Sequence, residues 1–129
     1  MAKIKKFEEI VSWKKARALA NEVYEATSVG EFYRDFGLKD QVRRASVSIL
    51  SNIAEGFERG GDKEFLHFLS IAKGSCGELR AQFYIALDQR YISETEFNKL
   101  VGKATEVSQL LSAFMKYLKQ SPLRGSKLR

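Results

Sequence analysis

The sequence predicts an all-α protein: an antiparallel up-down-up-down four-helix bundle forming a single domain over residues 1–129. Apolar residues recur at helical spacing along almost the whole chain, and no stretch shows the alternation typical of a strand. Four such segments of about 20 residues are joined by short connections, which is the pattern of an up-down bundle. The 129 residues are 44% hydrophobic and 29% charged. This is the composition of one ordinary globular domain.

The first half of the chain is expected to hold two of the helices. The first is predicted over roughly residues 7–27, followed by a loop over residues 28–37. The second is predicted over roughly residues 38–57. The run from Arg59 to Gly61 ends it, because two consecutive glycines form a tight break between helices.

The third helix is predicted over roughly residues 63–89, with Asp62 as its N-cap. A short acidic side chain at that position can accept hydrogen bonds from the free amides of the first turn. Gly74 and Gly77 fall on the side of this helix away from its apolar stripe. They either let a neighbouring backbone come close or are tolerated defects, and their propensity cost alone does not separate the two interpretations.

The fourth helix is predicted over roughly residues 94–119. Ser93 begins it, and Glu96 three residues later completes a capping box. Pro122 ends the helix, since proline cannot continue it. Residues 120–129 are expected to form a short basic tail.

The net charge of +6 is unevenly spread along the chain. The segment 31–90 is neutral, whereas both flanking segments are basic. The segment 91–129 is the more basic of the two, with seven basic and three acidic side chains. Basic ends suit an acidic partner such as RNA, although charge of this kind also serves solubility alone.

Several protein classes are excluded by composition. One cysteine forms no internal disulfide, which favours a reducing compartment. The longest uncharged stretch, Ala45 to Ala54, is far shorter than the roughly 20 apolar residues of a membrane span. The N-terminus has no hydrophobic run after its lysines and therefore no signal peptide. We expect a cytoplasmic protein with no membrane partner.

The second helix has an unusually wide apolar arc. Counted at about 100° per residue, the arc spans about 200°, whereas a helix facing one core needs little more than about 100°. The excess favours packing against another subunit. The alternative is a helix that touches two neighbours within its own bundle. The residues predicted to form the oligomer interface are Arg43, Val47, Leu50, Ala54 and Phe57, with Arg43 pairing with a carboxylate of the neighbouring subunit.

No constellation in the sequence indicates catalysis. Glu64 and His67 form a Glu-x-x-His pair, but carboxylate-bridged di-iron bundles need two such pairs, and this chain has one histidine. Cys76 lies within the apolar stripe of the third helix, where a thiol behaves as a small hydrophobe. No Walker loop or dinucleotide fingerprint occurs. We expect a protein that is not an enzyme, with no metal and no cofactor.

A dense motif lies in the second helix. The run from Gly37 to Gly56, GLKDQVRRASVSILSNIAEG, resembles the signature of the 23S rRNA intervening-sequence protein family, also called four-helix bundle proteins. The similarity covers roughly residues 7–118. It continues at Lys63-Glu64-Phe65, Phe68-Leu69, Ala72-Lys73-Gly74-Ser75 and Glu78-Leu79, and upstream at Phe7, Trp13, Lys15, Ala16 and Tyr24. The family commonly has proline at the position of Leu50. It often has threonine or serine at the position of Lys39, so the start of this helix is expected to be less well capped here.

The resemblance implies a left-handed up-down bundle that assembles as a ring-like homopentamer. Family members are encoded in insertions within bacterial 23S rRNA genes or as free-standing genes. A distantly similar bundle, the accessory protein of diversity-generating retroelements, is also pentameric and binds a reverse transcriptase and nucleic acid. The family itself has no established active site, so the resemblance implies a fold more firmly than a function.

These observations together predict a homo-oligomeric accessory protein that binds RNA or a nucleoprotein through charge. Contacts of this kind are salt-dependent and weakly sequence-specific. The predicted contact residues are Lys3, Lys5, Lys6, Arg44, Lys116, Lys119, Arg124, Lys127 and Arg129. Tyr33, Tyr91 and Tyr117 lie near loops or the tail and are the aromatic residues available for stacking on bases.

A protein–protein scaffold is the alternative function. In that case the charge serves solubility only, and polar residues of the second helix form a docking surface or a subunit contact. The residues of that surface are Ser48, Ser51, Asn52 and Glu55.

Overall fold

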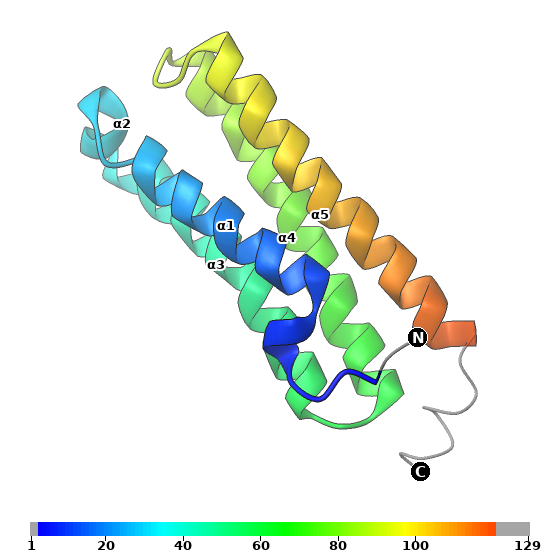
Figure 1. The fold of residues 1–129 in the computed structure, drawn as a ribbon. Helices are drawn as coiled ribbons and strands as arrows, with labels where there is room; N and C mark the ends of the chain where they lie inside the picture. Colours follow the sequence, from blue (N-terminus) through cyan, green and yellow to red (C-terminus); the bar gives the residue numbers. More distant parts are fainter. Residues whose placement is uncertain (1–2, 121–129) are drawn as a thin grey trace.

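A computed structural model describes residues 3–120, and every described secondary-structure element is helical (Figure 1). The prediction of an all-helical bundle is confirmed for this part of the chain. Assembly into a pentamer stays a prediction. The elements are a 3-10 turn, η1 (Phe7–Glu9), and five α-helices: α1 (Val11–Ala26), α2 (Gly30–Arg34), α3 (Phe36–Glu58), α4 (Asp62–Asp88) and α5 (Glu94–Gln120).

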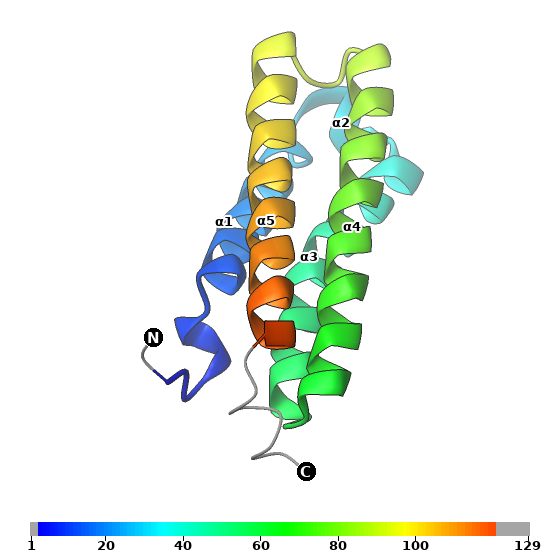
Figure 2. The same ribbon diagram turned by 90° about the vertical axis from the view of Figure 1, so that its right-hand side faces the viewer.

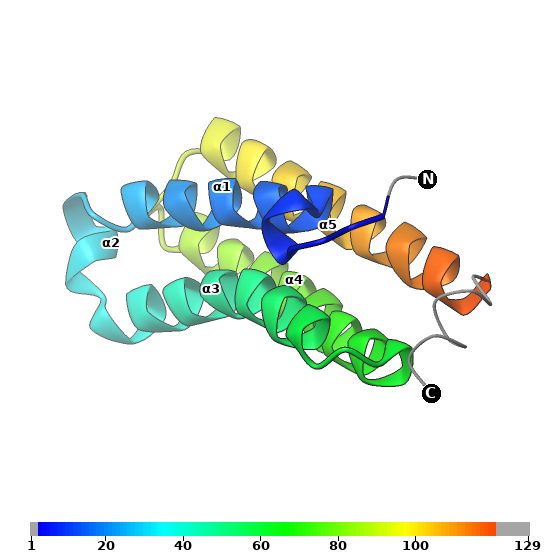
Figure 3. The ribbon, with the colours of Figure 1, turned by 60° about the horizontal axis from the view of Figure 1, so that its bottom comes forward.

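The four long helices pack around one core. α3 packs against α1 and α4, and α5 packs against α4 and α1, so each long helix has two neighbours. Figure 1 shows α1 and α3 on one side of the bundle and α4 and α5 on the other, and Figure 3, turned from that view, shows α1 and α5 above α3 and α4. η1 and the end of α5 lie at the end of the bundle where α3 turns into α4, whereas α2 lies at the opposite end (Figure 2).

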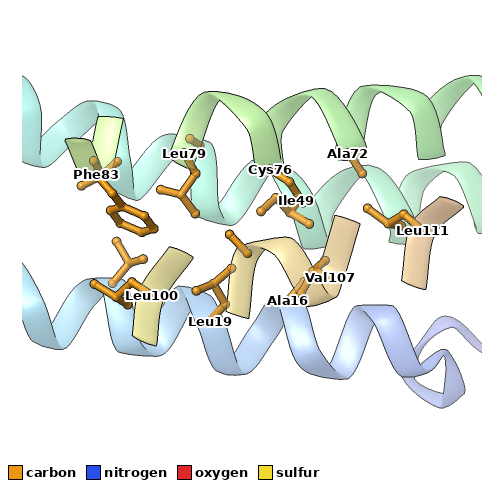
Figure 4. Close-up of a cluster of buried hydrophobic side chains, with 14 of the residues drawn as sticks. Ala16, Leu19, Ile49, Ala72, Cys76, Leu79, Phe83, Leu100, Val107 and Leu111 are labelled. Carbon is orange, nitrogen blue, oxygen red and sulfur yellow. The ribbon is translucent and has the colours of Figure 1, made fainter. Parts of the chain in front are cut away.

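The core is built from aliphatic and aromatic side chains of all four long helices (Figure 4). Phe83, Leu79 and Ile49 are almost fully buried. Cys76 lies among them, and burial raises the pKa of its thiol to about 11. The thiol therefore stays protonated near neutral pH and is a packing group rather than a nucleophile.

The start of the first helix differs from its prediction. Phe7–Glu9 form a separate 3-10 turn, and Ile10 is extended, with φ −74° and ψ 124°, before α1 begins at Val11. This break lets Ile10 enter the core, where its exposure is 3%, while the Phe7 ring packs edge-on against Trp13. Packing of Phe7 and Ile10 therefore accounts for the break between η1 and α1, where the sequence predicted one continuous helix.

The prediction of a loop over residues 28–37 is wrong for its middle. Gly30–Arg34 form the short helix α2, which starts at a glycine with φ +60°. Its anchor is Phe32, which is 1% exposed and stacks on the Tyr91 ring at 5.3 Å. The sequence did not show this, because the burial of Phe32 depends on Tyr91, a residue far away along the chain.

The start of α3 is better capped than the sequence suggested. The helix begins at Phe36, and the Asp35 carboxylate accepts a hydrogen bond from the Leu38 amide at 3.0 Å. The Tyr91 hydroxyl donates to the other carboxylate oxygen at 2.8 Å, which ties the α4–α5 connection to this cap. These two bonds lower the pKa of Asp35, the amide bond being the larger cause.

The charge of Asp35 makes stability depend on acidity. Because the folded pKa lies below the ordinary value of 3.8, the stabilisation is present above that value and is lost as pH falls from there through the folded pKa. Asp35→Asn keeps a capping oxygen but removes the charge. Between about pH 5 and about pH 2, urea unfolding should therefore show a smaller loss of stability in the variant than in the wild type. Equal losses would contradict the assignment.

The caps of the last two helices divide into one wrong and one correct prediction. The N-cap of α4 is Gly61, and Asp62 is the first helical residue, so the assignment of Asp62 as N-cap is wrong by one position. An acidic residue in the first turn still stabilises the helix, because its negative charge interacts favourably with the positive N-terminal end of the helix dipole. At α5 the capping box is confirmed: the Glu96 amide donates to the Ser93 hydroxyl at 3.1 Å, and the Ser93 amide donates to the Glu96 carboxylate at 3.2 Å.

Close backbone approach occurs at a different glycine from those considered in the sequence. A Cβ at Gly74 would meet nothing within 4 Å, and at Gly77 only the end of the Arg80 side chain. A Cβ at Gly56 would instead lie 2.7 Å from the Cβ of Phe68 and 3.0 Å from Cδ1 of Phe65. Gly56 is thus a position at which α3 and α4 approach each other too closely to leave room for a side chain.

Candidate nucleic-acid interface

The basic residues at the two ends of the described chain share one end of the bundle. Figure 1 shows η1 and the end of α5 at this same end of the bundle. A largely apolar hollow of about 380 Å³ joins the two segments, since Lys3 and Ile4 line it together with Leu110 and Phe114 of α5. All the predicted contact lysines in residues 3–120 are exposed: Lys3, Lys5, Lys6, Lys116 and Lys119. We call these five residues the lysine cluster.

The lysine cluster carries no ion pair within residues 3–120. Nearby acidic residues at the α3–α4 turn have partners of their own. Arg59 donates to Glu55 at 2.9 Å and to Glu64 at 3.3 Å, and the bond to Glu55 is the main reason why the pKa of Arg59 is raised. Glu55 and Glu64 are thus held by one arginine, and Glu9, which lines the hollow beside Lys3, accepts from the Lys5 backbone amide at 3.0 Å, so none of these three carboxylates pairs with a described lysine ammonium group of the cluster.

The other predicted contact residues do not join this cluster. Arg44 lies in the first half of α3 and donates to Asp40 at 2.8 Å, an exposed i,i+4 pair on its own helix. Its charge is therefore already balanced locally. Arg124, Lys127 and Arg129 lie outside the described residues.

Glu64 and His67, the pair weighed as a metal motif, are both exposed on α4. Glu64 pairs with Arg59, and the His67 ring packs edge-on against Phe68 at 5.4 Å. In residues 3–120 no group of three or more potential ligands gathers to hold a metal ion. None of the described helices has the length and apolar character of a membrane span.

The predicted interface residues follow one flank of α3. Val47 is 37% exposed, whereas Leu50, Ala54 and Phe57 are half-buried. Leu50 and Phe57 pack against the core, and the Phe57 ring meets Phe65 edge-on at 5.9 Å. Contact with two neighbouring helices therefore accounts for part of the wide apolar arc, which was the alternative left open, while Val47 remains on the surface.

Arg43 has partners within its own chain. Its Nε donates to the Thr27 hydroxyl at 2.8 Å, an Nη donates to Ser28 at 3.3 Å, and the guanidinium lies 4.3 Å from the centre of the Tyr24 ring. A cation at this place also complements the C-terminal dipole of α1. The expected pairing with a neighbouring subunit's carboxylate stays a prediction.

The polar residues of the alternative docking surface mostly bond within the bundle. The Ser48 hydroxyl lies 3.0 Å from that of Ser75 on α4, and the Asn52 amide donates to the Ser48 carbonyl at 2.8 Å. Glu55 pairs with Arg59, and Ser51 is exposed. Ser48 and Asn52 are therefore engaged within the bundle, whereas Ser51 and Glu55 remain on the surface, and a docking role for them stays a prediction.

Cation–aromatic contacts at the junction of α2 and α3 were missed in the sequence. Lys39 Nζ lies 3.9 Å from the centre of the Tyr33 ring and 4.7 Å from that of Phe36. Of the other tyrosines considered, Tyr91 stacks on Phe32, and Tyr117 is 40% exposed beside Phe114. The available signal was the i,i+3 spacing of Phe36 and Lys39, which puts both on one helix face.

Within residues 3–120, the fold and its surface define an all-helical bundle with exposed lysines at one end that make no ion pair in this part of the chain. The family model for 23S rRNA-intervening sequence protein matches residues 8–113, so the chain belongs to this family, as its second helix predicted. A solved protein of unknown function from the S23 ribosomal protein family of Bacteroides thetaiotaomicron VPI-5482 is 22% identical. It superposes with a TM-score of 0.75 over 82% of this chain and 99% of its own. A comparison with curated proteins gave no match.

Proposed function

We propose that this chain is a non-enzymatic, homo-oligomeric accessory protein that binds RNA in the cytoplasm. The observation that carries the proposal is the lysine cluster, in which two segments far apart in sequence bring exposed ammonium groups, none of them in an ion pair with a described residue, to one end of the bundle. The proposal is consistent with a family whose name refers to ribosomal RNA.

The mechanism is electrostatic. Ammonium groups that contact phosphates release the counterions condensed on the RNA, so affinity falls as salt rises. Such contacts position the RNA backbone and carry little sequence information. Self-association multiplies the number of clusters available to one RNA, and the shared effective concentration strengthens binding without new contacts.

The test compares two double substitutions that change the net charge equally. Lys116→Glu with Lys119→Glu removes two ammonium groups of the lysine cluster. Lys73→Glu with Arg90→Glu removes two exposed cations elsewhere, on α4 and in the α4–α5 connection. Fluorescence anisotropy with a structured ribosomal RNA fragment should show that only the first pair lowers the slope of log K against log salt, by about two.

Helix content, followed by circular dichroism, should be unchanged in both variants. Equal effects of the two pairs would mean that net charge alone attracts the RNA, which would overturn the assignment of the cluster. Binding of a protein partner that is insensitive to salt, without RNA binding, would favour the scaffold function instead.

A further inference from the structure

We propose that the aromatic side chains at the α2–α3 junction form a stacking site for unpaired bases of single-stranded RNA. The site consists of Tyr33, Phe36 and Lys39, with Tyr24 and Arg43 beside them; we call these five residues the aromatic patch. This inference rests on the proposed function, because it names a second contact surface and the form of RNA that it takes.

The rings of the aromatic patch are unusually exposed. Phe36 is 67% exposed and Tyr33 is 49% exposed. Between them lies the Lys39 ammonium, 3.9 Å from the Tyr33 ring centre and 4.7 Å from that of Phe36. Exposed rings grouped in one place, rather than scattered singly, favour an interaction surface.

A second cation–aromatic pair extends the patch onto α1. The Arg43 guanidinium lies 4.3 Å from the centre of the Tyr24 ring, which is 42% exposed. The bond from Arg43 Nε to the Thr27 hydroxyl, 2.8 Å long, fixes the plane of the guanidinium. Two cations and three partly exposed rings thus lie where α1 and α2 meet α3.

The patch also carries net positive charge. Neither Lys39 nor Arg43 makes an ion pair within residues 3–120, although carboxylates are near in sequence. Asp40 pairs with Arg44 at 2.8 Å, and Glu31 pairs with Arg34 at 3.2 Å. Asp35 accepts from the Leu38 amide and the Tyr91 hydroxyl.

The scaffold under the patch is held in place. The Asp35 cap orders the first turn of α3, and the Phe32–Tyr91 stack anchors α2 against the α4–α5 connection. Rings presented on an ordered surface lose little conformational freedom on binding, and this favours affinity.

This chemistry suits single-stranded RNA better than a protein surface. Bases stack on aromatic rings regardless of sequence, and nearby cations pair with the connecting phosphates. A protein that covered the patch would have to desolvate the Lys39 ammonium, and lysine is depleted at the centres of protein interfaces. Duplex RNA keeps its bases stacked internally and offers none to the rings.

The patch and the lysine cluster lie at opposite ends of the bundle, as Figure 1 shows for α2 and for the end of α5. The 23 residues of α3 alone span about 35 Å. The two contributions can therefore be changed separately: the cluster supplies salt-dependent affinity, whereas the rings supply affinity that depends little on salt.

The test is fluorescence anisotropy with two labelled probes, a single-stranded uridine oligonucleotide and an RNA hairpin with a short loop. Tyr33→Ala with Phe36→Ala should weaken uridine binding by at least about tenfold, with an unchanged salt slope and little effect on the hairpin. Lys39→Gln should reduce the magnitude of the slope of log K against log salt for the uridine oligonucleotide by about one. Tyr84→Ala, which truncates a ring on α4 that is 56% exposed, is the matched control and should change neither.

Three results would overturn the inference. In the first, the ring variant binds uridine as tightly as the wild type. In the second, it changes the native mass without changing RNA affinity, which would make the patch a contact with a second copy. In the third, the wild type binds the hairpin but not uridine, so the stacking site fails while the proposed function stands. If neither probe binds at low salt, the proposed function fails as well.

Discussion

Replacing Gly56 by alanine is expected to lower the free energy of unfolding by about 1–3 kcal/mol, the usual cost of overpacking. In an open helix position the same change stabilises, because glycine is about 1 kcal/mol less favourable than alanine. Here the added Cβ would lie 2.7 Å from the Cβ of Phe68, an atom fixed to the α4 backbone. The two helices would have to separate, so the steric cost exceeds the propensity gain.

The control for this prediction is Gly74→Ala on α4. Its added Cβ would meet nothing within 4 Å, so propensity alone should act and stabilise by about 0.5–1 kcal/mol. Urea unfolding of the two variants should therefore give shifts of opposite sign. A stabilised Gly56→Ala protein would mean that α3 and α4 do not approach as closely as described.

A second pair of substitutions on α3 separates folding from assembly. Ile49 is fully buried, so Ile49→Asp places an unpaired charge in the core and should leave the chain unfolded. Val47 is 37% exposed on the flank proposed to contact another subunit. Val47→Asp should therefore keep its helix content and dissociate the oligomer, because charges opposed across a homo-oligomeric contact repel.

Sedimentation velocity and circular dichroism together check this prediction. Ser51→Asp, an exposed change on the same helix, controls for added charge and should leave the native mass unchanged. If Val47→Asp retains the native mass of the wild type, the interface does not include this flank of α3. A monomeric wild type would overturn the oligomer itself.

The elements found from sequence alone were those with long periodic patterns or strong local signals. The four long helices and the Ser93–Glu96 capping box follow from apolar spacing and from capping chemistry acting within a few residues. The short helix α2 was not predicted, because its stability comes from Phe32 packing on Tyr91, a residue far away in sequence. The role of Gly56 escaped for the same reason, since its neighbour Phe68 belongs to another helix.

The candidate surfaces divide in the same way. Lysines near both ends of the chain were evident from composition, but their freedom from ion pairs depends on which carboxylates the fold places beside them. Arg44 pairs with Asp40 one turn earlier, which the i,i+4 spacing already offered, and its contact with RNA stays a prediction. The aromatic patch needs α1, α2 and α3 together, so periodicity within a single helix did not define it.

The most direct test of the central claim is the affinity of the wild-type protein for a structured ribosomal RNA fragment at two salt concentrations. Fluorescence anisotropy should show binding at low salt that weakens steeply as salt rises. If all five residues of the lysine cluster contact phosphates, a plot of log K against log salt should have a slope of about −3.5 to −4.5 or steeper. Absence of binding at low salt, or an affinity indifferent to salt, would contradict the account.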